Sequence, residues 1–396
     1  MLPKSWQIES LGSLLEESPQ NGYSPNCPEE PTGRWVLGLG ALTGNGLDFS
    51  QVKPAPINDI LVDRFQVHPG DFLISRSNTL DKVGRSALYR GGLEECSYPD
   101  LMMRFRVGSS RVDLDYLDAY LRSERVMKYI QRSATGTSGS MKKINQAVVE
   151  GIPIVLPSLI EQRQIAAILS IWDEAIGKTE RLIEGKERRY LWLLSSLISN
   201  MKHPHGHVRD FTSEVSRRNN GATINRVLSV TNNRGFVLPE DQFERRVASS
   251  DLSNYKIVTS GQYAYNPSRI NVGSIARLDG WDIGVLSPMY VVFKINENKV
   301  ISDFFLHWLE SHEAKERICK SAQGSVRETV SFTDLGAIPF PLPTRDHQEV
   351  IAETLNTAQR EIDILKKQAE AYRKQKLGLM QKLLTGEWRV KIKEEV

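Results

Sequence analysis

The chain is poor in cysteine and has no long apolar run. Its three cysteines, Cys27, Cys96 and Cys319, lie far apart among 396 residues. This number and spacing exclude a disulfide scaffold and a Cys-X-X-Cys metal site, and favour a reducing compartment. No stretch approaches the roughly 18 apolar residues that a membrane-spanning helix needs. The first residues lack the basic and apolar regions of a signal peptide, so we expect a cytoplasmic protein that does not enter a membrane.

The chain also lacks a strong excess of either charge. Lysine and arginine total 51 against 48 acidic residues, for a formal net charge of +3. This balance excludes a basic coat protein that binds nucleic acid regardless of sequence. Locally, nine basic residues face four acidic ones between Arg104 and Lys143, which indicates either a phosphate-facing patch or a solvated surface. The length and the ordinary share of apolar residues predict two or three globular domains.

An internal repeat is present instead, at a separation of about 190 residues. The segment VHPGDFLISRSN, which begins at Val67, is similar to VTSGQYAYNPSR, which begins at Val258. Farther along, GIPIVLP from Gly151 is similar to AIPFPLP from Ala337. The matches follow one order in both copies. The sequence therefore predicts two similar domains, whose short apolar runs between turn residues are typical of strands.

Each copy ends in a stretch that predicts a long helix. No proline follows Pro157 before Pro204, and none follows Pro343. Alternating steps of four and three select mostly apolar positions in both stretches, with charged residues between them, as in a coiled coil. Two ordinary amphipathic helices on separate cores are the alternative. We call these apolar positions the seam; it includes Leu169, Trp172, Ile176, Ile183, Leu355, Ile362, Leu365 and Tyr372.

The simplest partner for one seam is the other seam of the same chain. Bulky Trp172 matches small Ala358 in the repeat, which suits two different helices packing together. Two copies of a unit usually relate by a two-fold axis, which would run the helices antiparallel. We therefore predict an α+β fold with two similar domains, each followed by a long helix, and the helices packed as an antiparallel coiled coil. The predicted boundaries are 1–157 and 203–343 for the domains, 158–202 for the first helix, and 344–396 for the second helix and C-terminal tail.

No catalytic motif is recognisable. The chain lacks a phosphate-binding loop, an HExxH zinc motif and a GxSxG nucleophile turn. The segment GTSGSMKK from Gly136 has the wrong spacing for a phosphate loop and favours a flexible turn. In HPHGH, the side chains of His203, His205 and His207 could bind a metal, but without acidic or cysteine neighbours a solvated turn is favoured. We predict a binding protein without metal or cofactor, and an enzyme of unrecognised chemistry is the alternative.

One polar loop in each copy carries side chains suited to reading DNA. Arginine and asparagine form bidentate hydrogen bonds to guanine and adenine, although asparagine also forms turns, so the turn interpretation stays open for each residue. Two lysines near the first loop are candidate phosphate contacts. The candidate DNA-binding residues are Arg76, Asn78, Lys82, Arg85, Lys142 and Lys143 in the first copy and Asn266, Arg269, Asn271 and Arg277 in the second.

With its repeat and paired helices, the chain resembles the specificity subunit of type I restriction-modification enzymes over essentially its whole length. The most similar segments are GIPIVLPSLIEQRQIAAILSIWDEAI, AIPFPLPTRDHQEVIAETLNTAQREID and the ending KLLTGEWRVKI. The resemblance implies two target-recognition domains, each reading half of a bipartite site in double-stranded DNA. It also implies that the helices form a spacer and dock two methyltransferase (modification) subunits, which bind S-adenosylmethionine and methylate adenine, and that restriction and translocase subunits join this core.

The resemblance further implies that this subunit is not catalytic and binds no cofactor itself. The alternative function is a two-domain coiled-coil adaptor that binds proteins without DNA specificity. A gel shift in the presence of the partner subunits distinguishes the two, because an adaptor forms no sequence-dependent complex with DNA.

Overall fold

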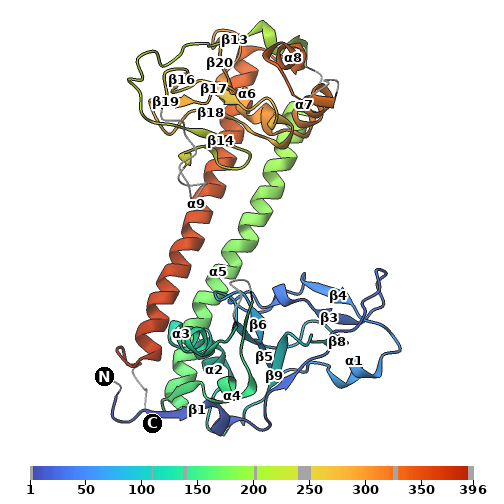
Figure 1. Ribbon diagram of the computed structural model, residues 1–396, viewed down its shortest axis with the longest axis vertical. Coiled ribbons are helices and arrows are strands. Elements are labelled where there is room, and N and C mark those ends of the chain that lie inside the picture. The colour runs from blue at the N-terminus through green and yellow to red at the C-terminus, as the bar shows by residue number, and fades with distance from the viewer. Residues whose placement is uncertain are drawn as a thin grey trace. The chain divides into compact units, whose positions relative to one another are not determined.

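The computed structural model describes residues 3–108, 110–136, 141–199, 203–239, 251–323 and 329–390 (Figure 1). The chain forms two compact units: unit 1 comprises Met1–Lys178 and Gln368–Val396, and unit 2 comprises Thr179–Lys367. Each unit is described by itself. Two long helices, α5 (Leu159–Leu194) and α9 (Arg345–Leu384), contribute residues to both units. Among the described residues, no helix combines the length and apolar character needed to cross a membrane.

Unit 1 is built on a four-stranded antiparallel sheet with the strand order β2-β9-β5-β7. Strand β5 is central and wholly buried, because its sequence FLIS presents apolar or small side chains on both faces. Helix α2 packs against this sheet, and its side chains join those of α5 and α9 in one core. The elements are β2 (Gln20–Asn21), β9 (Met102–Phe105), β5 (Phe72–Ser75), β7 (Ser86–Leu88), α2 (Leu114–Leu121) and α3 (Glu124–Ser133).

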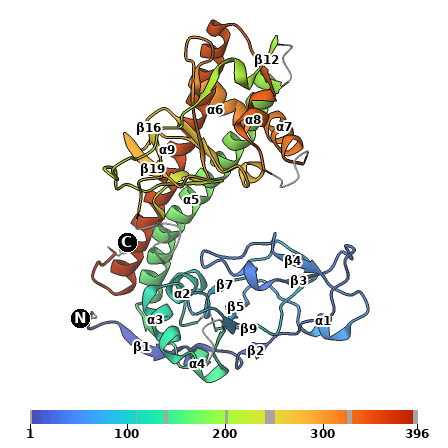
Figure 2. The ribbon, with the colours of Figure 1, turned by 45° about the horizontal axis from the view of Figure 1, so that its top comes forward.

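A second group of strands in unit 1 lies on the side of this sheet away from α5 (Figure 2). Strand β3 pairs antiparallel with β4 and parallel with β8, and these strands border a smaller apolar core. Elsewhere β6 pairs with β10, and β1 pairs with β11 just before α5 begins. The strands are β3 (Trp35–Leu37), β4 (Val52–Pro54), β8 (Cys96–Ser97), β6 (Ser77–Asn78), β10 (Lys142–Lys143), β1 (Gln7–Ser10) and β11 (Pro153–Leu156). Two short helices, α1 (Ile60–Arg64) and α4 (Gln146–Glu150), complete unit 1.

Unit 2 repeats this plan. Its four-stranded antiparallel sheet has the matching order β13-β20-β17-β18, and β12 pairs with β21 just before α9. Two strand pairs, β14 with β15 and β16 with β19, stand beside this sheet. The elements are β12 (His205–His207), β13 (Thr212–Glu214), β14 (Ser229–Thr231), β15 (Gly235–Val237), β16 (Lys256–Thr259), β17 (Tyr263–Tyr265), β18 (Ile275–Arg277), β19 (Ile283–Leu286), β20 (Val291–Ile295), α6 (Ser302–Glu310), α7 (His312–Gln323), α8 (Phe332–Ala337) and β21 (Pro339–Pro341).

Short polar side chains start several of the short helices. Asp113 accepts hydrogen bonds from two backbone N–H groups in the first turn of α2, and Asn145 accepts one in α4. Ser331 caps α8 in the same way and is joined by Asp334 in a capping box. Each cap satisfies N–H groups that have no partner within the helix.

Equivalent glutamines show that the repeat extends to atomic contacts. Gln162 of α5 and Gln348 of α9 are both buried. The Nε2 groups of these residues donate to the carbonyls of Pro157 and Pro343, each over 2.9 Å. Their Oε1 atoms accept from the residue preceding α2 (2.8 Å) or α6 (2.9 Å). Because a buried amide must be satisfied, each glutamine fixes the start of a long helix on its own domain. The predicted pair of similar domains is confirmed.

The long helices run antiparallel in unit 1. Glu161 of α5 pairs with Arg389, which follows α9, at 2.6 Å. Farther along α5, Asp173 pairs with Lys376, which lies earlier in α9. The contacts thus advance along one helix while they retreat along the other. The predicted antiparallel coiled coil is confirmed.

In unit 2 the helices are joined by two ion pairs, Lys186–Glu361 (2.6 Å) and Glu187–Lys366 (2.7 Å). Seam residues of both units are buried or half-buried. In unit 1, Trp172 and Tyr372 meet edge to face with ring centroids 5.8 Å apart. Leu169, Leu355 and Ile362 are buried, and Trp172, Ile176, Ile183, Leu365 and Tyr372 are half-buried.

The HPHGH segment is not the solvated turn that its composition predicts. His205–His207 forms β12, which pairs with β21, and His203 is buried with its Nε2 atom 3.2 Å from the carbonyl of Leu197. The strand pairing overrides the local preference of glycine for a turn. Within the ranges the structure describes, no group of three or more His, Cys, Asp or Glu is placed to hold a metal ion. Residues 137–140 of GTSGSMKK and residues 391–396 lie outside the described residues.

Candidate nucleic-acid interface

Strand pairing in unit 1 brings together candidate residues that are far apart in the sequence. In the β6–β10 ladder, Asn78 lies opposite Lys142, and the position before it lies opposite Lys143. The carbonyl of Arg76 accepts a hydrogen bond from Ile144 N (3.0 Å), which extends the contact. The polar loop and the two lysines, predicted separately, therefore belong to one surface.

The side chains on this surface differ in how much they are already engaged. Arg76 is half-buried, and its Nη1 donates to the carbonyl of Asp100 (3.3 Å). Asn78 is half-buried too, and its Oδ1 accepts from the next backbone N–H (2.9 Å), so it serves partly as a turn residue. Lys82 and Lys143 are exposed. These two ammonium groups are the most accessible to a phosphate.

Lys142 and Arg85 have local partners. The Nζ of Lys142 donates to the carbonyl of Gly136 (2.7 Å). The guanidinium of Arg85 is half-buried, 4.0 Å from the carboxylate of Asp81. Because this separation is long and Asp81 is exposed, solvent screens the pair and it restrains Arg85 weakly.

Two candidates in unit 2 have structural roles: Asn266 has the turn role that the sequence left open, and Arg277 has ion pairs that the sequence did not predict. Asn266 is 8% exposed, and its Oδ1 accepts from Ser268 N (3.0 Å), so it forms the turn itself. Arg277 pairs with Asp279 at 2.7 Å and with Asp303 of α6. Burial opposes the charge on Arg277, yet hydrogen bonds to these carboxylates hold its pKa above the usual value. We therefore leave both residues out of the proposed DNA contacts.

The other two candidates in unit 2, Arg269 and Asn271, are exposed. Neither side chain forms a hydrogen bond or ion pair with another residue that the structure describes. Arg269 caps the start of a short 3-10 turn, Asn271 lies inside it, and the turn is followed by Gly273, where φ is +92°. Its counterpart in unit 1, Gly84, also has a positive φ of +81°. The polar loops of both units thus turn on a left-handed glycine, a conformation that other residues rarely adopt.

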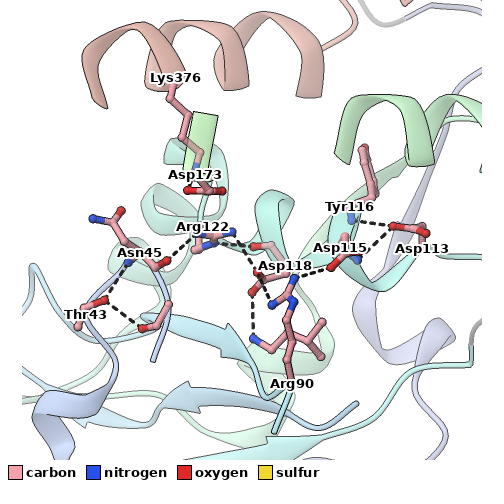
Figure 3. Close-up of polar contacts among 12 residues, drawn as sticks. Thr43, Asn45, Arg90, Asp113, Asp115, Tyr116, Asp118, Arg122, Asp173 and Lys376 are labelled. Atoms are coloured by element: carbon pink, nitrogen blue, oxygen red, sulfur yellow. Dashed lines mark hydrogen bonds and ion pairs between the residues drawn. The ribbon is translucent and has the colours of Figure 1, made fainter. Parts of the chain in front are cut away.

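A polar network in unit 1 joins the hairpin loop between Leu42 and Leu47 to helix α2 (Figure 3). This network was not predicted from the sequence. Arg122, the residue after α2, donates from Nη1 to the carbonyl of Asn45 and from Nη2 to the carboxylate of Asp118, each over 3.0 Å. Asp118 is buried and also accepts from Leu88 N in β7 (2.9 Å) and from Arg90 (3.5 Å). Arg122 therefore ties the loop to the main sheet.

The same network borders the ion pair between the long helices (Figure 3). Burial lowers the pKa of Lys376, and the positive charge of Arg122 lowers it further, whereas the hydrogen bond to Asp173 raises it. The four-residue spacing of Asp118 and Arg122 is a local sequence signal for their pairing once this stretch is helical. No local signal marked their distant partners.

A family model matches residues 3–185 and 253–371, well over half of the chain, and its description is type I restriction modification DNA specificity domain. The chain belongs to this family.

Curated relatives agree with this membership. A Methanocaldococcus jannaschii protein named for the MjaX type I restriction enzyme specificity subunit is 25% identical, over 98% of this chain and 95% of that protein. The MjaVIII specificity subunit of the same organism is also 25% identical, over 69% of this chain and 71% of its own.

Solved structures show the same fold. The type I restriction-modification S subunit from M. genitalium aligns with a TM-score of 0.60 and 15% identity, covering 97% of both chains. A chain from a structure describing complex assembly and conformational transition of the type I R-M system aligns with a TM-score of 0.56 and 16% identity. It covers 98% of this chain and 100% of that one.

Proposed function

We propose that this protein is the DNA sequence-recognition subunit of a type I restriction-modification complex, and that each unit reads one half of a bipartite target. The observation that carries the proposal is that a chain of this DNA specificity family holds two copies of one domain, matched down to the contacts of Gln162 and Gln348. Two copies of a recognition domain suit a target with two separate parts.

The proposed DNA contacts follow from accessibility. In this proposal exposed Lys82 and Lys143 contact phosphates, which adds affinity without sequence preference. Exposed Arg269 and Asn271 are proposed as base contacts, because their side chains are not engaged by described residues and carry the groups that recognise base edges. The remaining proposed contacts, each with a local hydrogen bond or ion pair, are Arg76, Asn78, Arg85 and Lys142.

The long helices are proposed to dock two modification subunits, with restriction and translocase subunits joining them in the cytoplasm. Apolar side chains off the seam are exposed on both helices, which suits a surface that another protein covers. In this proposal the modification subunits carry S-adenosylmethionine and the catalysis, and the chain itself is not an enzyme. The exposed apolar residues are Ile160, Ile171, Leu182, Leu191, Trp192, Val350, Ile364 and Leu377.

The test is to reconstitute the chain with its modification subunits and to map methylated adenines. We expect a motif of two defined halves separated by an unspecified spacer. Exchanging residues 1–157, the proposed first target-recognition domain, for that of a divergent relative should change one half only. A change in both halves, or in neither, would contradict the proposal. The absence of any sequence-dependent gel shift would favour the adaptor instead.

A further inference from the structure

We infer that each recognition domain has a second base-reading element, the tip of a hairpin that lies beside its glycine-containing polar loop. This inference rests on the proposed function. In unit 2 the tip is residues 232–234, between strands β14 and β15. In unit 1 it is residues 44–45, inside the hairpin closed by the bridge between Leu42 and Leu47. None of these residues was predicted from the sequence.

In unit 2 a threonine and a glycine hold the hairpin closed. Thr231 Oγ1 donates to the carbonyl of Gly235 (3.0 Å) and accepts from Arg234 N (3.0 Å). Gly235 has φ of +62°, which supplies the left-handed residue that the turn needs. The turn therefore forms without any hydrogen bond from the side chains at its tip.

Unit 1 has the same arrangement. Thr43 Oγ1 donates to the carbonyl of Gly46 (3.0 Å) and accepts from Asn45 N (3.2 Å). Arg122 holds the carbonyl of Asn45 from the other side (3.0 Å; Figure 3). We call the two hydrogen bonds of the threonine hydroxyl, one to the glycine carbonyl and one from a tip N–H group, the threonine–glycine clasp. Its presence in both units, around tips of different sequence, indicates a shared device that presents different side chains in the two units.

The clasp closes each hairpin without the side chains of the tip asparagines, so these side chains are not required to form the turn. Asn266 differs, because it is buried and uses its Oδ1 to close its own turn. Asn232, Asn233 and Arg234 are exposed, and their side chains form no hydrogen bond or ion pair with residues in the described ranges. Two amides and a guanidinium without a neighbouring carboxylate in the tip match the donor and acceptor patterns of adenine and guanine.

The tip in unit 2 lies against the loop already proposed to read bases. A Cβ atom placed on Gly273 would lie 3.5 Å from the carbonyl oxygen of Asn232 and 3.7 Å from its Cβ. Ser274 Oγ also donates to the carbonyl of Val230 (2.9 Å), which fixes the loop on the hairpin. The two loops line one groove of about 790 Å³ that includes Asn232, Asn271 and the tip guanidinium.

Of the two acidic residues of this groove, Asp279 has a cationic partner, whereas Glu310 keeps its negative charge and accepts a hydrogen bond from a neutral hydroxyl. Asp279 pairs with Arg277, and Glu310 accepts a hydrogen bond from Tyr190. The groove also contains the lysine Lys315 and the aromatic ring of Trp281. In unit 1 the same neighbourhood recurs, since a Cβ on Gly44 would lie 3.6 Å from Nε of Arg85, the residue that follows the left-handed Gly84.

The test uses the chain reconstituted with its modification subunits and a duplex library that carries every single-base change in both half-sites. The unit 2 variants are Asn232→Ala, Asn233→Ala and Arg234→Ala, and the unit 1 variant is Asn45→Ala. We expect at least one unit 2 variant to reduce discrimination at one or two adjacent positions of one half-site, by about 5-fold to 150-fold. Asn45→Ala should act on the other half-site only.

Asn298→Ala is the matched control, because Asn298 is an exposed asparagine of unit 2 in the connection between β20 and α6. It should leave every preference unchanged. Unchanged preferences in all tip variants would overturn the inference, as would weakening that is equal for all sequences, which marks phosphate contact alone. These outcomes are distinct from failure of the proposed function, in which the unaltered complex itself would show no bipartite motif.

Discussion

Replacing Asp173 with asparagine should destabilise unit 1, because it removes the counter-charge of a buried ammonium group. The side chain of Lys376 is 9% exposed and that of Asp173 is 41% exposed. Arg122 is close enough to lower the pKa of Lys376, so the lysine has a second positive charge as its neighbour. Asp173→Asn would leave Lys376 facing an amide that carries no charge, and the carboxylate that still attracts it, Asp118, is already paired with Arg122.

The structure sets the size of the effect. Breaking a fully buried pair destabilises a protein by about 3–5 kcal/mol, and breaking an exposed pair by about 0–1 kcal/mol. Since one partner here is buried and the other is partly screened by water, we expect about 2 kcal/mol. For a unit of about 200 residues this corresponds to a decrease in melting temperature of about 4–8 °C.

The loss should be smaller at high pH. Burial and Arg122 lower the pKa of Lys376 in the folded chain, and removing Asp173 should lower it further. The unfolded chain then binds more protons than the folded one between that pKa and the unperturbed value of about 10.4, so stability rises with pH in this window. The variant should gain more stability than the unaltered chain as pH rises toward 10, because its lysine releases its proton earlier.

The assay is a set of thermal melts at neutral and alkaline pH on the unaltered chain and three variants. Glu174→Gln is the matched control, because Glu174 is the adjacent carboxylate and its pair with Lys178 is exposed; it should change stability by less than about 0.5 kcal/mol. The double variant Asp173→Asn/Lys376→Met should recover at least half of the loss, since it removes the buried charge. The reasoning fails if Asp173→Asn and Glu174→Gln have the same melting temperature. It also fails if the double variant has a melting temperature no higher than that of Asp173→Asn.

Three further substitutions test other contacts by thermal melting. Trp172→Glu should destabilise unit 1 by several kcal/mol, because a carboxylate would replace an aromatic ring in the seam, whereas exposed Ser170→Glu should be nearly neutral; equal melts would refute the seam register. Arg389→Ala should destabilise by about 2–4 kcal/mol, because it leaves the buried carboxylate of Glu161 without its cation, and an unchanged melt would refute that role. Gly84→Ala should destabilise by about 2–4 kcal/mol, because the new methyl group would lie 2.5 Å from a side chain of α3 at positive φ, and a neutral result would show that the loop relaxes.

The fold could be predicted because its strongest determinants are periodic. The heptad pattern continues through both helices, and its polar exceptions include two lysines that pair across the coiled coil. Lys376 is matched with Asp173, and Lys186 with Glu361. A polar residue at a seam position fixes the register of two helices, so these exceptions reinforce the pattern. The residue-level domain boundaries stay predictions, because the division into units cuts through both helices.

The candidate contacts were harder to rank, because the sequence does not show which side chains already have partners. Arg277 and Arg269 are the same residue type in one predicted loop. The difference between them arises from α6, which brings Asp303 to Arg277 and leaves Arg269 exposed. Asn266 was open to either interpretation, and burial together with its bond to Ser268 decides for the turn. These partners depend on tertiary structure, which a local motif does not encode.

The threonine–glycine clasp suggests how such domains can acquire new targets while keeping their fold. The hydrogen bonds that close each hairpin come from Thr43 or Thr231 and from backbone groups. Substitution of an exposed tip side chain therefore removes no turn hydrogen bond, and surface substitutions of this kind usually change stability by less than about 0.5 kcal/mol. Loss of the threonine hydroxyl should instead destabilise the hairpin and displace every tip side chain together. The proposed reading of bases and the folding of the hairpin thus depend on different residues of one hairpin. Tip variants should therefore change recognition, and clasp variants should change folding.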